Sequence, residues 1–485
     1  MTYFYGVRKK KNIILEDLLV ENYAAEGKSL ARRDGKVVFI ENVVPGDVVD
    51  VRLSKNKKDW AEGYPVEFRS YSTERVTPFC QHFGVCGGCQ WQMLPYQKQL
   101  QYKQQQVLDN LTRIGKIDLP QMEPIAGAPQ DRFYRNKLEY TFSTKEYTAV
   151  APPRKIRTEE GLTIMPEKPP PANVLGFHAR GFFDKIVNIE KCWLQEDLTN
   201  HLRNSIREFA LANHFSFYDF REHRGMLRNL QVRLCTTGEV MVNLVLGEDH
   251  EKRRNRILEF IDQQFPELTT LLYTINLKKN DSLFDLDPIV YKGKGFVIEQ
   301  LEDFRFKIGP KSFFQTNTKQ AEKLYSITRE YAELDGSQVV YDLYCGTGSI
   351  GIFCSSKAKK IIGVELIEAA VKDAGENALL NNIPHASFFT GDVTDVCNNE
   401  FFAAHGRPDV IITDPPRAGM HEKLVLKILE MEAPVVVYVS CNPATQARDL
   451  ALLDAKYEVT RCQPVDMFPH THHIENVVQL KIKKQ

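Results

Sequence analysis

One cysteine near the C-terminal end of the chain stands where a nucleophile is expected. The run Val435–Ser440 is apolar and rich in β-branched residues, which predicts a buried parallel strand. Cys441 follows this strand directly, and Asn442-Pro443 ends it. In open α/β sheets, ligands bind beyond the carboxyl ends of the strands. A thiol at that place is positioned to attack a ligand, although a buried structural role is the commoner fate of cysteine.

A second group of residues predicts a nucleotide-like cofactor. Residues 340–351 form a predicted strand, a glycine-rich turn and the start of a helix, which together bring backbone N–H groups close to a ligand. Acidic residues end the next three predicted strands, at Glu365, Asp392 and Asp414. Such side chains can accept hydrogen bonds from ribose hydroxyls or an adenine amino group. Dehydrogenases that bind NAD share this spacing, but the sequence contains no evident hydride-transfer constellation.

Three further cysteines are spaced as metal ligands. Cys80, Cys86 and Cys89 form the pattern C-x5-C-x2-C, and two glycines between the last two allow the backbone to fold around a ligand. A tetrahedral site needs a fourth partner. The chain has ten cysteines and no signal-peptide pattern, so we expect metal binding, catalysis or packing rather than a disulfide framework.

The elements that must position the first two groups alternate between strand and helix over residues 310–485. This alternation predicts βαβ units and a doubly wound sheet. The predicted parallel strands are Val339–Tyr344, Lys360–Glu365, Ala386–Gly391, Val410–Thr413 and Val435–Ser440. The predicted helices between them are Ile350–Ser355, Ala369–Leu380 and Glu422–Met431, and a closing pair of strands covers Tyr457–Val465 and Glu475–Ile482.

Two more parts precede this region. Residues 1–72 contain five short β-like runs with turn signals such as Asp34-Gly35, which predict an OB-like β-barrel, a common platform for nucleic acids. Residues 73–309 predict a central α+β domain that carries the cysteine triplet and a helix over Pro95–Ile114. A proline-rich stretch, Ala151–Ala172, predicts an exposed loop.

Composition excludes several classes of protein. The chain has 485 residues, enough for two or three domains, and it has no apolar run of transmembrane length. The first eleven residues lack the apolar core of a signal peptide, so we expect a cytoplasmic protein with no membrane partner. Lys and Arg number 63, as do Asp and Glu, so the net charge does not by itself indicate nucleic acid.

Several motifs together resemble the RNA uracil-5-methyltransferase family, whose members act on tRNA and 23S rRNA. The glycine turn, the strand-end acids and the seven-strand pattern resemble the methyltransferase sheet that binds S-adenosylmethionine (SAM). The motifs are specific as a set, and with the N-terminal barrel the resemblance spans essentially the whole chain. They are Phe313-Phe314-Gln315-Thr316-Asn317, Asp414-Pro415-Pro416-Arg417, Ser440-Cys441-Asn442-Pro443-Ala444-Thr445 and His472-His473-Ile474-Glu475-Asn476-Val477.

The resemblance assigns a role to each of these residues. It implies that Cys441 is the nucleophile and that Glu475 is the base, although Glu475 taken alone could be an ordinary carboxylate at a strand entry. The positions that it implies for cofactor or substrate binding are Gln315, Tyr344, Glu365, Asp392 and Asp414.

The chemistry explains why a thiol and a base are needed. C5 of uracil is too weak a nucleophile to take a methyl group from SAM directly. A thiolate that adds to C6 makes C5 carbanion-like, and a base must later remove the C5 proton so that the thiol can leave. A free thiol has a pKa of ~8.5, so we expect the site to favour the thiolate, aided by a helix that begins near Thr445.

The N-terminal half carries its own resemblances. Glu26–Arg32, Gly35–Ile40 and Val44–Asp47 resemble a TRAM domain, an RNA-binding module. Cys192 matches the distant fourth cysteine of the 23S rRNA branch, whose members hold a [4Fe–4S] cluster, and zinc is the rival metal. The resemblance thus implies Cys80, Cys86, Cys89 and Cys192 as ligands, and 23S rRNA as the target with tRNA as the alternative. We also expect a monomer.

Two hypotheses from other classes of protein compete with a uracil-5-methyltransferase. A radical-SAM RNA-modifying enzyme also combines TRAM with iron and sulfur, but it needs C-x3-C-x2-C, and the chain has no such triplet. A non-catalytic RNA-binding protein is the other alternative, and the presence of both Cys441 and Glu475 argues against it.

Overall fold

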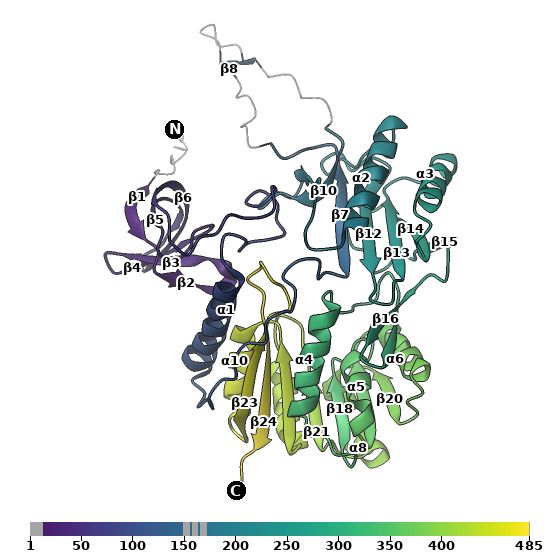
Figure 1. Cartoon of the computed structure of the whole chain (residues 1–485). Helices are drawn as coiled ribbons and strands as arrows, with labels where there is room; N and C mark the ends of the chain where they lie inside the picture. The colour runs from purple at the N-terminus through teal and green to yellow at the C-terminus, as the bar shows by residue number, and fades with distance from the viewer. Residues whose placement is uncertain (1–12, 149–155, 158–162, 165–171, 485) are drawn as a thin grey trace, which may run out of the picture.

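The computed structural model describes residues 13–148, 156–157, 163–164 and 172–484. Figure 1 shows three parts: an N-terminal β-sheet at the upper left, a central α/β part at the upper right, and the C-terminal sheet with its helices below them. Of the proline-rich stretch, only two two-residue strands and Ala172 are described, so the rest of that predicted loop lies outside the described residues.

The N-terminal part is a strongly curled six-stranded sheet in the order β1-β5-β6-β4-β3-β2. Asp34 and Gly35 both have positive φ angles, of 49° and 77°, as the tight turn between β3 and β4 requires. Leu18, Val38 and Val49 belong to a small buried core of this part. Its strands are β1 (Ile14–Leu19), β2 (Asn22–Tyr23), β3 (Ser29–Arg33), β4 (Lys36–Ile40), β5 (Val48–Asn56) and β6 (Trp60–Ser70).

The central part is a seven-stranded mixed sheet in the order β11-β10-β7-β12-β13-β14-β15. Two helices, α2 (Asp197–Ala212) and α3 (Glu251–Gln264), pack in the same apolar cluster as the sheet. The strands are β7 (Lys137–Ser143), β10 (Val174–His178), β11 (Ile186–Asn188), β12 (Leu227–Leu234), β13 (Val240–Leu246), β14 (Thr270–Ile275) and β15 (Ile289–Lys292). The separate short pair is β8 (Ile156–Arg157) and β9 (Thr163–Ile164).

The C-terminal part confirms the predicted doubly wound sheet. Its order is β20-β19-β18-β21-β22-β24-β23; the first five strands are parallel, and β24 runs antiparallel to both neighbours. The strands are β18 (Val339–Leu343), β19 (Lys360–Glu365), β20 (Ala386–Thr390), β21 (Val410–Thr413), β22 (Val435–Ser440), β23 (Tyr457–Val465) and β24 (Glu475–Ile482).

Helices cover both faces of this sheet because each central strand is apolar on both sides. Val340 and Val437 face a cluster that contains α4, α5 and α6, whereas the neighbouring Tyr341 and Val436 face a cluster that contains α8, α9 and α10. The helices are α4 (Thr318–Tyr331), α5 (Ser349–Cys354), α6 (Glu368–Leu380), α7 (Val393–Val396), α8 (Asn399–His405), α9 (Glu422–Met431) and α10 (Pro443–Leu453).

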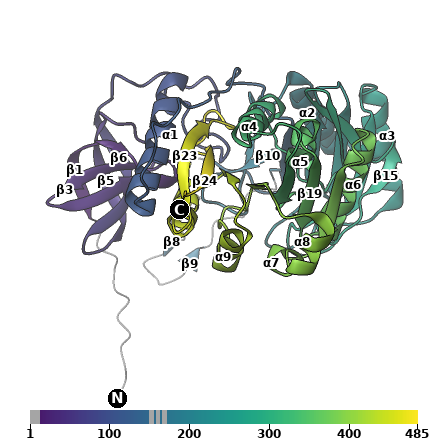
Figure 2. The same ribbon diagram turned by 90° about the horizontal axis from the view of Figure 1, so that it is seen from below.

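Two segments that precede residue 310 pack on the C-terminal sheet. Helix α1 (Tyr96–Asn110) continues as a short π-helical turn, Leu111–Gly115, and its Val107 packs in one cluster with Leu450 of α10. Seen from below in Figure 2, α1 lies between the N-terminal sheet and β23–β24. The hairpin β16 (Val297–Leu301) and β17 (Phe304–Ile308) contacts α4 and α6. The C-terminal core therefore includes residues outside 310–485.

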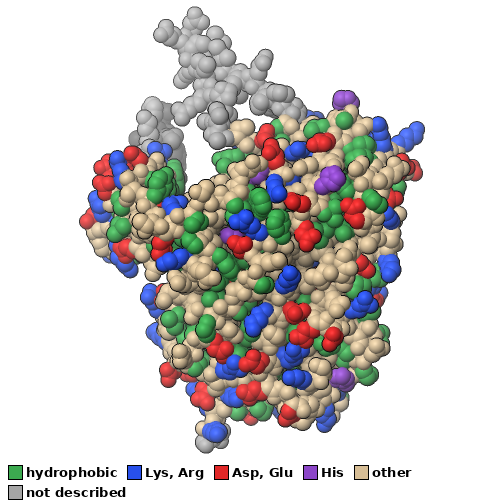
Figure 3. Space-filling model, in the orientation of Figure 1, with side chains coloured by type: hydrophobic (Ala, Val, Ile, Leu, Met, Phe, Trp, Pro, Cys, Tyr) green, Lys and Arg blue, Asp and Glu red, His purple; other side chains and the backbone are tan. Residues whose placement is uncertain are grey.

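The molecular surface carries charges of both signs. Figure 3 shows Lys and Arg side chains interspersed with Asp and Glu over the face in view, rather than gathered into one patch. Among the described residues, no helix has both the length and the apolar character that a membrane span requires.

Candidate active site

Cys441 lies at the junction between a central strand and a helix. Strand β22 ends at Ser440, and α10 begins at Pro443 with Asn442 as its N-cap, whose side chain accepts a hydrogen bond from the backbone N–H of Ala444 at 3.1 Å. Proline at the first helical position fits because no N–H is needed there. The thiol therefore sits at the carboxyl edge of the sheet, next to a helix N-terminus, as the sequence predicts.

The electrostatics of Cys441 differ from the expectation of a stabilised thiolate. Burial raises the pKa of its thiol to about 12, and the nearby carboxyl groups of Glu475 and Asp414 add to this shift. The guanidinium of Arg417 acts in the opposite direction but does not offset it. Cys441 therefore favours its protonated form, because the helix N-terminus does not compensate for desolvation and two acidic neighbours.

Glu475 is brought to Cys441 by antiparallel pairing. Ser440 of β22 pairs with Asn476 of β24, so Glu475 occupies the next position of the register, beside Cys441. Glu475 is only 5% exposed, and burial together with the charge of Asp414 raises its pKa well above the usual range. This carboxyl group can therefore hold a proton near neutral pH.

Asp414 completes this acidic group. It follows β21, and burial raises the pKa of its carboxyl group to about 7. The loop after it is fixed to the start of α10, because the carbonyl of Arg417 accepts hydrogen bonds from Asn442 Nδ2 at 3.0 Å and Thr445 Oγ1 at 3.2 Å. Two carboxyl groups and one thiol thus share one weakly solvated region.

The glycine-rich turn lies at the same edge. Tyr344 has a φ of 61°, and Gly346 and Gly348 have φ values of 53° and 76°, which let the chain turn sharply between β18 and α5. The carboxylate of Glu365 accepts hydrogen bonds from the backbone N–H groups of Gly346 at 3.2 Å and Ile367 at 3.0 Å. Glu365 is therefore held directly against the turn.

The two other predicted cofactor residues flank this turn. Asp392 caps α7, where one of its carboxylate oxygens accepts hydrogen bonds from the backbone N–H and the hydroxyl of Thr394, which lowers its pKa. Gln315 lies between β17 and α4 and is 7% exposed, and its carbonyl accepts a hydrogen bond from Asn136 Nδ2 at 2.9 Å. The central part of the chain thereby supports the segment that presents Gln315.

One acidic residue at this edge was not predicted. Asp342 is 1% exposed within β18; its Oδ2 accepts a hydrogen bond from the backbone N–H of Gly351 at 2.8 Å, whereas its buried Oδ1 has no partner. Burial raises its pKa to about 7. The signal was an aspartate inside an otherwise apolar strand, four residues before Gly346.

The four predicted metal ligands line one cavity of about 350 Å³. All ten cysteines of the chain are free thiols, and burial raises the pKa of Cys86 and Cys89 to about 12. Burial also raises the pKa of Cys80 and Cys192. In the part of the chain that the structure describes, no group of three or more His, Cys, Asp or Glu side chains is arranged to hold a single metal ion.

Comparisons with known proteins agree with this geometry. The family model described as tRNA (uracil-5-)-methyltransferase matches residues 290–483. An uncharacterized RNA methyltransferase of Bacteroides thetaiotaomicron is 52% identical over 463 residues, which cover 95% of this chain and 100% of that protein. One from Porphyromonas gingivalis is 46% identical over 465 residues, covering 95% of this chain and 98% of that protein. The chain belongs to the RNA uracil-5-methyltransferase family.

A solved structure resembles the whole chain. The Pyrococcus abyssi tRNA (uracil-54, C5)-methyltransferase, in complex with S-adenosyl-L-homocysteine, superposes with a TM-score of 0.72 at 26% sequence identity. The match covers 95% of this chain and 99% of that one. This protein is therefore a SAM-dependent RNA methyltransferase, and its three parts occur together in an enzyme of the same family.

The buried Asp342 generates a prediction about stability and pH. Its folded pKa of about 7 lies above the unfolded value of about 3.9, so the folded chain binds more protons between these two values. Stability should then fall as the pH rises from about 4 to about 7, with a slope of up to ~1.4 kcal/mol per pH unit from this residue. Asp342→Asn should flatten this slope and raise the melting temperature at pH 7.

Thermal unfolding of the ligand-free protein at pH values between 5 and 7.5 would measure this effect. Asp303→Asn, at the exposed turn between β16 and β17, serves as the control, because it removes an acidic group without changing a buried one. Equal slopes in both variants would contradict the prediction.

Proposed function

We propose that this protein methylates C5 of a uridine in RNA by covalent catalysis through Cys441. The observation that supports the proposal is the register of β22 and β24, which sets the thiol of Cys441 and the carboxyl group of Glu475 side by side at the edge that also bears the glycine turn. A thiol and a base are the two groups that this reaction requires.

The steps use the residues as follows. The Sγ of Cys441, after releasing its proton to solvent, forms a bond to C6 of the uracil. C5 then takes the methyl group, and in a separate last stage the carboxylate of Glu475 removes the C5 proton. The C5–C6 double bond then re-forms, the Sγ–C6 bond breaks, and the thiolate leaves. SAM supplies the methyl group and a positive sulfonium.

The electrostatics of the site support this sequence of steps. Cys441, Glu475 and Asp414 all have raised pKa values because the site is poor in water and rich in acid. A cationic ligand bound among them favours their ionised forms. Binding of the cofactor therefore promotes the thiolate, which the protein alone disfavours.

The residues for cofactor and substrate remain those that the sequence predicts. We assign Tyr344, Glu365, Asp392 and Asp414 to the cofactor and the adjoining target base, and Gln315 to the contact between the two, where its amide can pair with a uracil edge. Phe313, which is 72% exposed and lies two residues from Gln315, offers a stacking surface for a base that has left its stack.

The RNA target is proposed to be 23S rRNA. The support is the cysteine spacing of Cys80, Cys86 and Cys89 together with Cys192, all on one cavity. A tRNA uridine is the second candidate, because the enzyme from Pyrococcus abyssi matches nearly the whole length of this chain. We assign the N-terminal sheet, as a TRAM module, to RNA binding in either case.

We propose that the cysteine cavity holds a [4Fe–4S] cluster. Its donor set is four thiols in an otherwise largely apolar cavity, and buried thiolates need a positive partner. Four cysteine thiolates are the usual ligands of a [4Fe–4S] cluster, and zinc is the rival for the same donor set. The cluster would act there as a structural element, because Cys441 needs no electron transfer.

RNA that contains 5-fluorouridine tests the proposed chemistry. The fluorine cannot be removed as a proton, so the wild-type protein with SAM should form an adduct that survives denaturing electrophoresis. Cys441→Ala should form no adduct and should lose methyl transfer by a factor of ~10⁴ or more, yet still bind SAM. An adduct with Cys441→Ala would show that another residue is the nucleophile.

Mass spectrometry of cellular RNA tests the proposed target. Cells that lack the gene should lose 5-methyluridine from a site in 23S rRNA and regain it when the wild-type gene, but not the Cys441→Ala form, is restored. Loss of the modification from tRNA alone would exclude 23S rRNA and establish the second candidate.

Metal analysis of the full-length protein tests the cluster. Protein purified without oxygen should contain about four irons and four sulfides per chain. Cys89→Ser should lower both, whereas Cys397→Ser, a buried cysteine away from the cavity, should not. One zinc ion and no sulfide would favour the rival metal, and the absence of both would contradict the proposal.

A further inference from the structure

The connection between β23 and β24 is unusually buried for a loop. Residues 466–474, which we call the junction loop, lead from the end of β23 directly into Glu475. Loops normally run over the surface because their backbone polar groups need partners. Here five members are at most 3% exposed, namely Asp466, Met467, His470, Thr471 and Ile474. The junction loop must therefore find its partners inside the protein.

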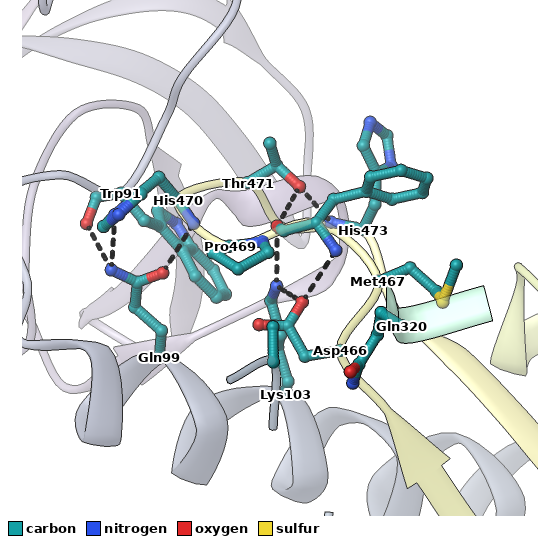
Figure 4. Close-up of polar contacts among 12 residues, drawn as sticks. Trp91, Gln99, Lys103, Gln320, Asp466, Met467, Pro469, His470, Thr471 and His473 are labelled. Carbon is teal, nitrogen blue, oxygen red and sulfur yellow. Dashed lines mark hydrogen bonds and ion pairs between the residues drawn. The ribbon is translucent and has the colours of Figure 1, made fainter. Parts of the chain in front are cut away.

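Helix α1 supplies the first of these partners. Lys103 Nζ lies 2.6 Å from Asp466 Oδ1, and both side chains are fully buried. The same Nζ donates to the carbonyl of Phe468 at 3.2 Å, and Tyr96 donates its hydroxyl proton to Asp466 Oδ2 at 2.9 Å. Figure 4 shows Lys103 reaching from α1 to Asp466 at the base of the loop. A buried charge pair of this kind fixes geometry closely because neither partner is stable alone there.

Gln99, one turn earlier on α1, holds the middle of the loop. Its Oε1 accepts a hydrogen bond from the backbone N–H of His470 at 2.8 Å, and its Nε2 lies 3.1 Å from His470 Nδ1 (Figure 4). The carbonyl of His470 accepts hydrogen bonds from the backbone N–H groups of Gln90 at 2.8 Å and Trp91 at 3.0 Å. His470 has a φ of 65°, a left-handed conformation that these contacts maintain.

The central part of the chain and the N-cap of α4 supply further hydrogen bonds to the junction loop. Tyr134 donates its hydroxyl proton to the carbonyl of Pro469 at 3.0 Å, and Asn317 Nδ2 donates to the carbonyl of Met467 at 2.9 Å. The far end of the loop is the buried Ile474, and the next residue is Glu475. The position of Glu475 therefore depends on contacts between the junction loop and residues up to 380 positions earlier in the sequence, the separation of Gln90 from His470.

We propose that Lys103, Asp466 and Gln99 are positioning residues that hold the junction loop so that Glu475 faces the target carbon. This role rests on the proposed function of Glu475 as the base. None of the three touches Cys441, and their effect reaches the reaction only through the loop.

Because Glu475 acts in only one stage of the reaction, loss of positioning affects that stage alone, whereas a general structural defect affects every stage. Formation of the Sγ–C6 bond and attack of C5 on the methyl group use Cys441 and SAM, with S-adenosylhomocysteine as the leaving product. Only the last stage needs Glu475, which takes the C5 proton while the Sγ–C6 bond breaks and thiolate is released. A displaced Glu475 should leave the first stage intact and make the methylated adduct accumulate.

Lys103→Met tests the proposal. With methyl-labelled SAM and bulk RNA from cells that lack the gene, the variant should resolve its adduct ~10- to 100-fold more slowly than wild type, as expected for a catalytic group displaced by about 1 Å. Trapping by RNA with 5-fluorouridine does not need the base, so its rate should stay within about twofold of wild type.

Lys98→Met is the matched control. Lys98 lies on the same helix and forms an ion pair with Glu74 at 2.5 Å, away from the junction loop. The same chemical change there should alter neither trapping nor resolution. Accumulated adduct in Lys98→Met would mean that α1 acts through its general stability, which would overturn the specific role of Lys103.

A double variant separates positioning from folding. Lys103→Met leaves Asp466 with an unpaired buried charge, whereas Lys103→Met with Asp466→Asn removes both charges and should recover thermal stability. The double variant should still resolve its adduct slowly, because the ion pair that fixes the loop is gone. A stable double variant with wild-type resolution would overturn the proposal, and one that fails to fold would reduce the pair to a structural role.

The same measurements distinguish this proposal from the proposed function. Suppose that the wild-type protein traps RNA with 5-fluorouridine but that the Lys103 variants release the methylated RNA from Cys441 at the wild-type rate. In that case only the positioning role is wrong. If the wild-type protein traps no such RNA, the proposed chemistry falls, and the role of the junction loop falls with it.

Discussion

The acidic, weakly solvated edge of the C-terminal sheet is the constraint on which the rest of the structure depends. Three carboxyl groups, Asp342, Asp414 and Glu475, lie there with raised pKa values, and Cys441 shares their surroundings. Such a group of acids is costly to ionise, so each carboxyl group favours its protonated form. It becomes favourable once a cation binds, which suits a SAM-dependent enzyme.

Keeping these groups in place requires more than the methyltransferase sheet. Helix α1 and the residues just after Cys89, Gln90 and Trp91, precede the sheet by more than two hundred residues. They nevertheless form hydrogen bonds to the loop that leads into Glu475. The N-terminal part also lies close to this loop. Gly27, between β2 and β3, packs so tightly against His472 that a Cβ at position 27 would lie only 2.9 Å from the Cβ of His472. The three parts of the chain therefore converge on one short connection, which gives the N-terminal half a physical link to the reacting residues.

Much of the C-terminal fold could be predicted because its signals are local. Uninterrupted apolar runs such as Val410–Thr413 and Val435–Ser440 matched β21 and β22, and the final strands Tyr457–Val465 and Glu475–Ile482 matched β23 and β24. The pKa of Cys441 could not be predicted. A helix N-terminus next to the thiol is visible in the sequence, but the two carboxyl groups that oppose it come from other strands.

The sequence by itself determined which groups can react: a thiol after an apolar strand, a glycine turn, strand-end acids and a cysteine triplet. These follow from residue types and short spacings, which local backbone preferences decide. Only the tertiary structure decided the pKa values of these groups and which residues hold them in place, because both depend on burial and on contacts between distant segments. Lys103 and Asp466 look like ordinary surface charges in the sequence, and folding brings them together at 2.6 Å with no exposure to water. Asp342 likewise becomes a proton-holding group only because the sheet and its helices exclude solvent around it.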